Sequence, residues 1–364
     1  MTDKNDLMRE MVVYDSAIIN AMFTRFLEGY DDIGVVASVG DGALAPKAIE
    51  RNDIDLVLLD IEVPNMDGLT ALPLPIKAQP KLVVIMVSSL TERNAEISLR
   101  ALRMGATDYV TKPSSREALR DADDFKRDLI SKVRALGKTG RRRSSGAGKV
   151  SIPADGPEAP PKPDAEVVLR SAESEKPRVL AIGSSAGGSQ ALVEVLKTIT
   201  QGISLPILIT QHMPPTFTAI LADHMGQATG WPSTEAKDGK VIENWHIYAA
   251  PGGKHLLVQS EGTKKIFRLS DEPPENFCKP AVDPILRSIA KAYGPSVLAM
   301  ILTGMGYDGR AGAKVIVECG GTVIAQDKES SVIWGMPGAV ATSGLCNAVL
   351  PFKDLGSHAS KLAA

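Results

Sequence analysis

A serine stands at the centre of a glycine-rich turn in the second half of the chain. The segment Ile182-Gly183-Ser184-Ser185-Ala186-Gly187-Gly188 follows an apolar run, precedes a helical pattern and satisfies G-x-S-x-G with Ser185 in the middle. A tight turn from strand to helix exposes the hydroxyl, and the N–H groups at the helix start can bind an oxyanion. Glycine-rich turns also bind nucleotide phosphates, but this turn has neither G-x-G-x-x-G nor a P-loop lysine. The pattern therefore favours Ser185 as a nucleophile.

A serine nucleophile needs a base, and four of the five histidines lie in this half ahead of the C-terminal tail. His212 follows the apolar run 205–210, so it is expected at the carboxyl end of a buried strand, on the same sheet edge as Ser185. His224 falls on the apolar side of a helical pattern, and His246 and His255 fall at strand starts. Position alone makes His212 the best candidate, although a structural histidine is common at such a place.

An acid that could orient this histidine follows the most apolar run of the chain, residues 297–303. The next residues, Gly304-Met305-Gly306-Tyr307-Asp308-Gly309, present Asp308 in a glycine-flanked turn; an ordinary Asx turn is the alternative. Asp308 would hold the imidazole of His212 and stabilise its charged form. The three residues predict acyl transfer through a covalent intermediate. Their order, Ser-His-Asp, differs from the Ser-Asp-His order of the α/β-hydrolase superfamily.

A second set of polar residues follows the strand-like runs of the first half. The set comprises Asp15, Asp60, Ser88 and Lys112. Because the carboxyl ends of parallel strands meet at one edge of a sheet, these side chains are expected to converge. Carboxylates and a main-chain carbonyl can hold Mg²⁺, and a hydroxyl and an ammonium can neutralise an incoming phosphoryl group. Singly, Asp15 could be a helix N-cap and Lys112 part of a turn.

The elements that must position these residues alternate between strands and helices. In the first half we predict strands at 11–14, 34–39, 55–59, 82–87 and 108–110, with a helical stripe at 18–27. In the second half we predict strands at 178–182, 205–210, 246–249, 255–258, 297–303 and 322–325, with helical stripes at 191–196 and 285–292. This alternation indicates an α/β protein with two doubly wound parallel sheets. The strand order is not predicted.

Residues 137–177 differ in composition from both halves. They contain an arginine triplet, a serine pair and several prolines with few large apolar residues, which predicts a flexible linker between domains at 1–136 and 178–364. The formal net charge of -2 gives no field that would attract nucleic acid. Three cysteines without C-x-x-C spacing argue against a disulfide framework and a thiolate zinc site. The apolar runs are too short for membrane insertion, and the polar start lacks a signal core, so a cytoplasmic location is expected.

The first half resembles the receiver domains of two-component response regulators over about residues 8–130. The resemblance is carried by Val12-Val13-Tyr14-Asp15-Ser16, by 59–68 (LDIEVPNMDG), by Val87-Ser88-Ser89 and by 108–113 (DYVTKP). It implies a flavodoxin-like fold in which Asp60 accepts the phosphoryl group. It also implies that Asp15, Asp60 and the main-chain carbonyl of Glu62 bind Mg²⁺, that Ser88 and Lys112 contact the phosphoryl group, and that Tyr109 is the switch aromatic.

Two departures from the receiver pattern stand out. Tyr14 occupies a position where the family has an acid, so the metal cluster has lost one carboxylate. Pro73 and Pro75 interrupt the helix expected after Asp60, and we expect that helix to be shortened or distorted. A degenerate receiver that no longer takes phosphate is therefore an alternative.

The second half resembles the catalytic domain of chemotaxis protein-glutamate methylesterases, the CheB family, over nearly all of 178–350. The matching motifs are Ile182–Gly188, 211–214 (QHMP), 250–253 (APGG), 279–283 (KPAVD), Leu302–Gly309 and 334–338 (WGMPG). The resemblance implies a larger α/β domain of hydrolase type with Ser185, His212 and Asp308 as the triad. It also implies that main-chain groups around Ala186 and Met305 bind the oxyanion.

A receiver ahead of this domain is also the architecture of that family. The resemblance implies demethylation of glutamate methyl esters on methyl-accepting chemoreceptors with release of methanol, deamidation of receptor glutamines in some members, and control by receiver phosphorylation. It implies a chemotaxis histidine kinase as a second partner. Mg²⁺ would serve phosphorylation only, and hydrolysis would need no cofactor. The alternatives are a general serine esterase with a degenerate receiver and a non-catalytic signalling scaffold.

Overall fold

The computed structural model describes residues 7–112, 120–145, 166–171 and 175–364 of the 364-residue chain. The chain forms two compact units, Met1–Val150 and Ser151–Ala364. Helix α6 (Arg120–Ser145) corrects one expectation, because residues 137–145 of the predicted linker form its end. Residues 166–171 lie along the second unit, where the N–H of Arg170 donates to the carbonyl of Cys346 at 2.9 Å. The rest of the predicted linker up to 165, and residues 172–174, lie outside the described residues.

The first unit is built on a five-stranded parallel sheet of order β2-β1-β3-β4-β5. Its strands are β1 (Met8–Val13), β2 (Ile33–Val39), β3 (Leu56–Asp60), β4 (Val83–Ser88) and β5 (Asp108–Thr111). Strands β1, β3 and β4 are buried along nearly their whole length, because helices cover both faces of a doubly wound sheet. All five predicted strands are confirmed to within a few residues.

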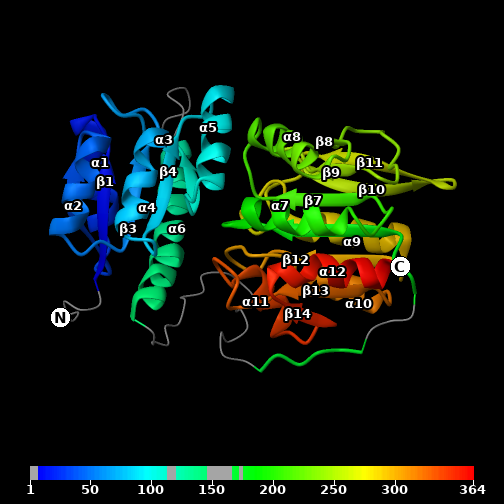
Figure 1. The fold of residues 1–364 in the computed structure, drawn as a ribbon. Helices are drawn as coiled ribbons and strands as arrows, with labels where there is room; N and C mark the ends of the chain where they lie inside the picture. The colour runs from blue at the N-terminus through cyan, green and yellow to red at the C-terminus, as the bar shows by residue number, and fades with distance from the viewer. Residues whose placement is uncertain (1–6, 113–119, 146–165, 172–174) are drawn as a thin grey trace. The chain divides into compact units, whose positions relative to one another are not determined.

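The helices of the first unit lie around this sheet (Figure 1). They are α1 (Ala17–Glu28), η1 (Gly42–Leu44), α2 (Ala45–Arg51), α3 (Gly68–Ala71), α4 (Pro73–Ala78), α5 (Glu92–Arg103) and α6. Helix α1 packs against α6, and α2 against α4. The expected helix after Asp60 is divided into α3 and α4 at Leu72, directly before Pro73. Proline lacks an N–H and clashes with the preceding turn, so the predicted distortion is confirmed.

The second unit is built on a seven-stranded parallel sheet of order β14-β13-β12-β6-β7-β9-β8. The strands are β6 (Val179–Ser184), β7 (Ile207–Gln211), β8 (Ser233–Glu235), β9 (Ile247–Ala249), β12 (Val297–Ile301), β13 (Thr322–Gln326) and β14 (Ala348–Leu350). Two short edge strands, β8 and β14, were not predicted. The predicted strand at 255–258 is part of β10 (His255–Glu261), which pairs with β11 (Lys264–Ser270) as a separate antiparallel hairpin. Its assignment to the parallel sheet was therefore wrong.

Helices cover both faces of this sheet. They are α7 (Gly188–Ile199), α8 (Phe217–Thr229), α9 (Val282–Tyr293), α10 (Arg310–Glu318), α11 (Met336–Ala341) and α12 (Phe352–Ala363). Helix α7 packs against α12, and α9 against α10 (Figure 1). Strand β6 lies between β12 and β7, so the turns that follow these three strands meet at one edge of the sheet. Among the described residues, no helix is long and apolar enough to cross a membrane.

Strand β1 contains a buried acid, Glu10. Glu10 is 0% exposed, and neither oxygen of its carboxylate has a hydrogen-bond partner within the described part of the chain. Burial raises the pKa of Glu10 well above its ordinary value, and the charges of Asp32 and Asp55 act in the same direction. The folded state therefore holds this proton more tightly than the unfolded state, and stability is lost as the pH rises from the unfolded pKa towards the folded one.

We predict that Glu10→Gln stabilises the protein at pH 8 by at least about 1 kcal/mol, since an uncompensated buried charge costs more than an unpaired neutral group. The advantage should vanish below about pH 4, where the carboxyl is protonated in the folded and the unfolded state alike. Denaturant unfolding of the full chain, followed on the receiver transition at several pH values, measures this difference. A constant difference across the whole pH range would contradict the assignment.

Candidate active site and phosphoacceptor site

Ser185 lies in the turn between β6 and α7. The neighbouring Ser184 is fully buried, whereas Ser185 is partly exposed. The N–H of Ser185 donates to the carbonyl of Thr303 at 3.0 Å, and Thr303 Oγ1 donates to the carbonyl of Ala186 at 3.0 Å. Gly187 has a φ of 74°, and a Cβ there would meet Val332 at 2.6 Å. The turn is thus held against the end of β12 and presents the hydroxyl of Ser185, not that of Ser184.

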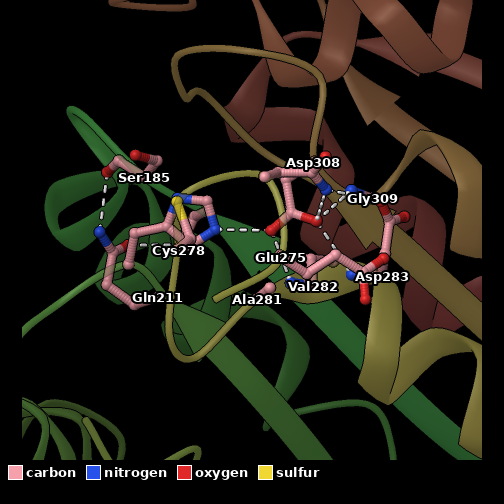
Figure 2. Close-up of polar contacts among 12 residues, drawn as sticks. Ser185, Gln211, Glu275, Cys278, Ala281, Val282, Asp283, Asp308 and Gly309 are labelled. Carbon is pink, nitrogen blue, oxygen red and sulfur yellow. Dashed lines mark hydrogen bonds and ion pairs between the residues drawn. The ribbon is translucent and has the colours of Figure 1, made fainter. Parts of the chain in front are cut away.

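Gln211, the last residue of β7, braces this turn. Its amide oxygen accepts from Ser184 Oγ at 2.5 Å, and its Nε2 donates to the carbonyl of Ser185 at 2.8 Å (Figure 2). Gln211 is buried, so both ends of its amide are satisfied within the protein. The sequence did not predict this role, because Gln211 appeared there only as the first residue of the 211–214 motif.

His212 and Asp308 form the pair that the sequence predicted. His212 Nε2 lies 2.7 Å from Asp308 Oδ2, and the His212 side chain is 12% exposed against 2% for Asp308. The other ring nitrogen, Nδ1, lies 3.2 Å from the sulfur of Cys278. Among the described residues, no hydrogen bond joins Ser185 Oγ to His212. The structure therefore brings the predicted base and acid together. It also places the thiol of Cys278, for which the sequence predicted no role, at the other ring nitrogen of His212.

The carboxylate of Asp308 accepts hydrogen bonds from several directions. Besides His212, the donors are the N–H groups of Val282 (2.6 Å), Asp283 (3.0 Å) and Gly309 (2.9 Å) and the amide of Asn276 (3.0 Å). Burial alone would raise the pKa of Asp308, but the His212 contact and these N–H groups outweigh it and hold that pKa below its ordinary value. Asp308 is therefore an anion that can fix and charge-stabilise an imidazole.

A second buried acid, Asp283, lies beside Asp308. Its Oδ2 accepts from Asn276 Nδ2 at 2.9 Å, and its Oδ1 accepts from the N–H of Gly312 at 2.6 Å. Burial, followed by the charge of Asp308, raises the pKa of Asp283 to about 7. Asn276 thus bridges two carboxylates with one amide group. Figure 2 shows these two acids, Asp283 and Asp308, beside each other. Nothing in the spacing of Asn276 or Asp283 indicated this role.

The electrostatics of His212 follow from its two neighbours. Burial lowers its pKa, but the electrostatic interaction with Cys278 and the hydrogen bond to Asp308 outweigh burial and raise the pKa of His212 above its ordinary value. Both neighbours of the ring, the sulfur of Cys278 and the carboxylate of Asp308, therefore favour the charged form of the imidazole.

The predicted oxyanion donors lie next to Ser185. A Cβ on Gly304 would come within 2.9 Å of Ser185 Cβ and 2.3 Å of Met336 Sδ, so the turn after β12 passes directly by the serine. Within the described ranges, neither the N–H of Ala186 nor that of Met305 donates to a protein acceptor. Main-chain donors without a protein partner beside a nucleophile can bind the oxygen of a tetrahedral intermediate.

In the first unit, Lys112 and Asp60 form an ion pair. Lys112 Nζ lies 2.8 Å from Asp60 Oδ1 and 3.8 Å from Glu62 Oε2, while Asp60 is buried. Burial raises the pKa of Asp60, and Lys112 opposes that shift. Lys112 also lies over the ring of Tyr14, 4.7 Å from its centroid. Burial, as the largest cause, raises the pKa of Tyr14, so its phenol is neutral near pH 7.

Ser88 lies beside Lys112, whose N–H donates to the carbonyl of Ser88 at 2.7 Å, and Tyr109 lies further back in β5. Ser88 is fully buried, and its hydroxyl donates to the carbonyls of Ser89 (3.2 Å) and Asn94 (3.4 Å). Tyr109 is buried in β5 with Lys132 Nζ 5.2 Å from its ring centroid, and burial raises its pKa well above the ordinary value. Contact of Ser88 with a phosphoryl group and switching by Tyr109 stay predictions.

The oxygen donors near Asp60 fit a hard cation. Asp15 is exposed, Asp60 is buried, and both carboxylates act on Tyr14 electrostatically. In the described part of the chain, no three His, Cys, Asp or Glu side chains are grouped to hold one metal ion. By the receiver resemblance, the donors would be the carboxylates of Asp15 and Asp60 and the main-chain carbonyl of Glu62. Mg²⁺ prefers such oxygens and completes its shell with waters.

We predict that Asn276→Asp destabilises the protein by roughly 2 kcal/mol or more near pH 8. A third carboxylate would replace the donor that serves Asp283 and Asp308, and breaking a buried polar network by one member has a cost of this order. Both residue types tolerate the left-handed backbone at this position (φ 53°). Unfolding midpoints of the full chain measure the effect, with Asn276→Gly as the matched control. Equal losses in the two variants would show that the added carboxylate has no effect of its own, and no loss in either variant would contradict the bridging role.

Comparisons with known proteins match both units of the chain. A family model described as CheB methylesterase matches residues 180–359, and one described as response regulator receiver domain matches residues 11–123. A protein-glutamate methylesterase/protein-glutamine glutaminase of Paramagnetospirillum magneticum is 52% identical over 99% of this chain and 97% of its own length. A namesake from Rhodospirillum rubrum is 51% identical over 96% of this chain and 94% of its own.

Among solved structures, the CheB methylesterase catalytic domain of Thermotoga maritima is 37% identical. It matches with a TM-score of 0.50 and covers 52% of this chain and 100% of that domain. The agreement of whole-chain relatives, two family models and the fold leads to one conclusion: the chain belongs to the CheB methylesterase family of hydrolases, with a response regulator receiver domain ahead of its catalytic domain.

Proposed function

We propose that this protein hydrolyses glutamate γ-methyl esters on methyl-accepting chemoreceptors and releases methanol. The observation that carries the proposal is the buried Asp308 carboxylate, 2.7 Å from Nε2 of His212, on the sheet edge where Ser185 is partly exposed. Relatives that are about half identical over the whole chain bear the name of this activity. A small-ester hydrolase would need the same triad, so the receptor substrate rests on the family.

The first half-reaction forms an acyl-enzyme. Nε2 of His212 is committed to Asp308, so Nδ1 is the atom that takes the proton of Ser185 as its oxygen attacks the ester carbonyl. The C=O bond becomes a C–O⁻ single bond, which the N–H groups of Ala186 and Met305 stabilise. The tetrahedral intermediate then collapses, the C–OCH₃ bond breaks, and methoxide leaves as methanol with the proton from His212.

The second half-reaction returns the free enzyme. Water attacks the acyl carbon, His212 takes one of its protons, and a second tetrahedral oxyanion forms in the same place. Collapse breaks the bond to Ser185 Oγ, which regains its proton from His212, and the product leaves as a carboxylic acid that ionises to glutamate by giving its proton to water. A receptor glutamine would follow the same steps with ammonia as the leaving group. This reaction needs no metal ion.

The receiver is proposed to control this hydrolysis through phosphorylation of Asp60 by a chemotaxis histidine kinase. The observation that supports this part of the proposal is the contact between Asp60, the proposed acceptor, and Lys112, which lies 2.8 Å away and would neutralise the phosphoryl oxygens. Asp15, Asp60 and the Glu62 carbonyl would hold Mg²⁺, which supplies positive charge to the transferring group. Neutral Tyr14 cannot replace a carboxylate, so weak Mg²⁺ binding is expected. Action on cytoplasmic receptor segments places the protein in the cytoplasm.

We predict that Ser185→Ala removes on the order of a millionfold of kcat for methanol release from methylated receptor, because no other hydroxyl takes its place in the triad. Ser184→Ala is the matched control: its hydroxyl is buried against Gln211, so the loss should be far smaller. Both variants should melt as cooperatively as the unsubstituted protein. An inactive Ser184→Ala beside an active Ser185→Ala would overturn the nucleophile assignment, and activity confined to free esters would overturn the substrate.

We further predict that a small phosphodonor with Mg²⁺ raises the hydrolase rate of the full chain and that Asp60→Asn removes the increase. The basal rate should be unchanged in Asp60→Asn, and a chelator should abolish activation without touching basal turnover. In the same Mg²⁺ titration, Tyr14→Asp should reach half-activation at a lower Mg²⁺ concentration, because it adds a carboxylate to the cluster. Activation that persists in Asp60→Asn would refute phosphorylation at this residue.

A further inference from the structure

Cys278 stands where a nucleophile would stand in a cysteine hydrolase. Its sulfur lies 3.2 Å from Nδ1 of His212, and the opposite nitrogen of that ring lies 2.7 Å from the buried carboxylate of Asp308. A thiol, an imidazole and an orienting acid in this sequence of contacts make the thiol reactive, because the imidazole takes its proton and the thiolate is the attacking form. Hydrolysis as derived above makes no use of this sulfur.

The backbone holds the thiol at this place. Glu275 and Cys278 exchange two main-chain hydrogen bonds of 3.1 and 2.9 Å across a tight turn. The two central residues of the turn, Asn276 and Phe277, have φ values of 53° and 62°, and such left-handed conformations cost energy for residues other than glycine. The amide of Asn276 anchors the turn to Asp308, and Glu275 forms a two-pronged ion pair with Arg287. The thiol therefore points at His212 because the turn is fixed at both ends.

The three cysteines differ in exposure and surroundings, so two of them can serve as controls for the third. Cys278 is partly exposed, Cys319 is exposed, and Cys346 is fully buried. Burial raises the pKa of Cys346 to about 12, which keeps that thiol protonated and inert. Cys319 offers solvent access without a histidine contact among the described residues. Reactivity from exposure alone would therefore favour Cys319, whereas reactivity from the imidazole contact would favour Cys278.

We propose that Cys278 is an oxidation site at which hydrogen peroxide or a related hydroperoxide switches the hydrolase off. In the reaction, the thiol proton moves to Nδ1 of His212 and the thiolate attacks one peroxide oxygen. The S–O bond forms, the O–O bond breaks, and the departing hydroxide takes the proton from His212 as water. The sulfur is oxidised to a sulfenic acid and the peroxide is reduced, with overall stoichiometry of one thiol and one peroxide giving one sulfenic acid and one water.

The consequence for hydrolysis follows from which atom the sulfur faces. Nδ1 of His212 is the nitrogen left to accept the Ser185 proton, and an added oxygen on Cys278 would occupy the space beside it and hydrogen-bond to it. The hydrolase would then lose its base until a thiol reductant restores the cysteine, with two reductant thiols forming a disulfide and releasing water. This inhibitory step rests on the proposed function, whereas the reactivity of the thiol does not.

The first experiment measures reactivity without reference to hydrolysis. The full-length protein is treated with limiting iodoacetamide or with hydrogen peroxide plus a sulfenic-acid-trapping dione, and labelling of each cysteine is followed by peptide mass spectrometry. Cys278 should react at least about tenfold faster than Cys319, and His212→Gln should reduce the Cys278 rate to near that of Cys319. Equal rates in the unsubstituted protein, or a Cys278 rate unmoved by His212→Gln, would overturn the proposal.

The second experiment connects reactivity to the hydrolase. Peroxide should inactivate the protein in proportion to Cys278 sulfenic acid, and dithiothreitol should restore the lost rate. Cys278→Ser, compared with its own untreated rate, should resist peroxide, whereas Cys319→Ser should be inactivated like the unsubstituted protein. Full activity with oxidised Cys278 would overturn the switch. No hydrolysis in the untreated protein would instead contradict the proposed function, while the labelling rates would still test the thiol.

Discussion

The carboxylate of Asp308 is buried, charged and surrounded by hydrogen-bond donors, and the catalytic unit is arranged around it. Its partners come from the residue after β7 (His212), from the first two residues of α9 (Val282 and Asp283) and from the residue before α10 (Gly309). A buried charge is tolerable only when its hydrogen-bonding capacity is met. Meeting it brings the ends of these elements to one point, and the same contacts fix the orientation of the imidazole. The stability of the folded catalytic unit and the orientation of His212 therefore depend on the same hydrogen bonds to Asp308.

Two residues that do no chemistry in the proposed reaction complete this arrangement. Asn276 supplies one amide to two carboxylates, and Gln211 supplies one amide to the Ser184 hydroxyl and the Ser185 carbonyl. A side-chain amide is suited to both places because it is neutral and carries donors and an acceptor. Cys278 belongs to the same loop as Asn276, so the turn that braces the acid also delivers a thiol to the base.

Much of this could be read from the sequence because parallel sheets follow simple rules. Buried strands gave continuous apolar runs, and the residues after them were placed on one edge, which located Asp308 beside His212. The edge strands β8 and β14 escaped because short, half-exposed segments carry little pattern. The β10–β11 hairpin was assigned to the sheet because strand patterns do not reveal partners. The stretch 304–309 also satisfies G-x-G-x-x-G; here the N–H of Gly309 binds the chain's own Asp308, where a nucleotide phosphate would otherwise be the anion.

The contacts missed by sequence reasoning share one property, which is that they join residues far apart in the chain without a period or motif. Cys278 meets His212, and Asn276 meets Asp308, only because the 275–283 segment crosses the sheet edge. In the receiver, the motifs indicated Lys112 and Asp60 correctly as neighbours, but not that Tyr14 would lie beneath the lysine. The spacing of apolar residues predicts helices and strands. The positions of the loops between them depend on tertiary packing, which that spacing does not reveal.

The position of β6 has a consequence for how the protein is made. It is the first strand of the catalytic unit, yet its register partners on one side are in β12, with Val179 opposite Val297. During synthesis the serine turn leaves the ribosome about 120 residues ahead of Asp308, which at about 5–20 residues per second is a delay on the order of ten seconds. Until β12 has been synthesised, the apolar edge of β6 that pairs with β12 in the folded unit lacks its native partner. The nascent chain therefore passes through a stage exposed to misassembly, and the hydrolase can be assembled only after β12 has emerged.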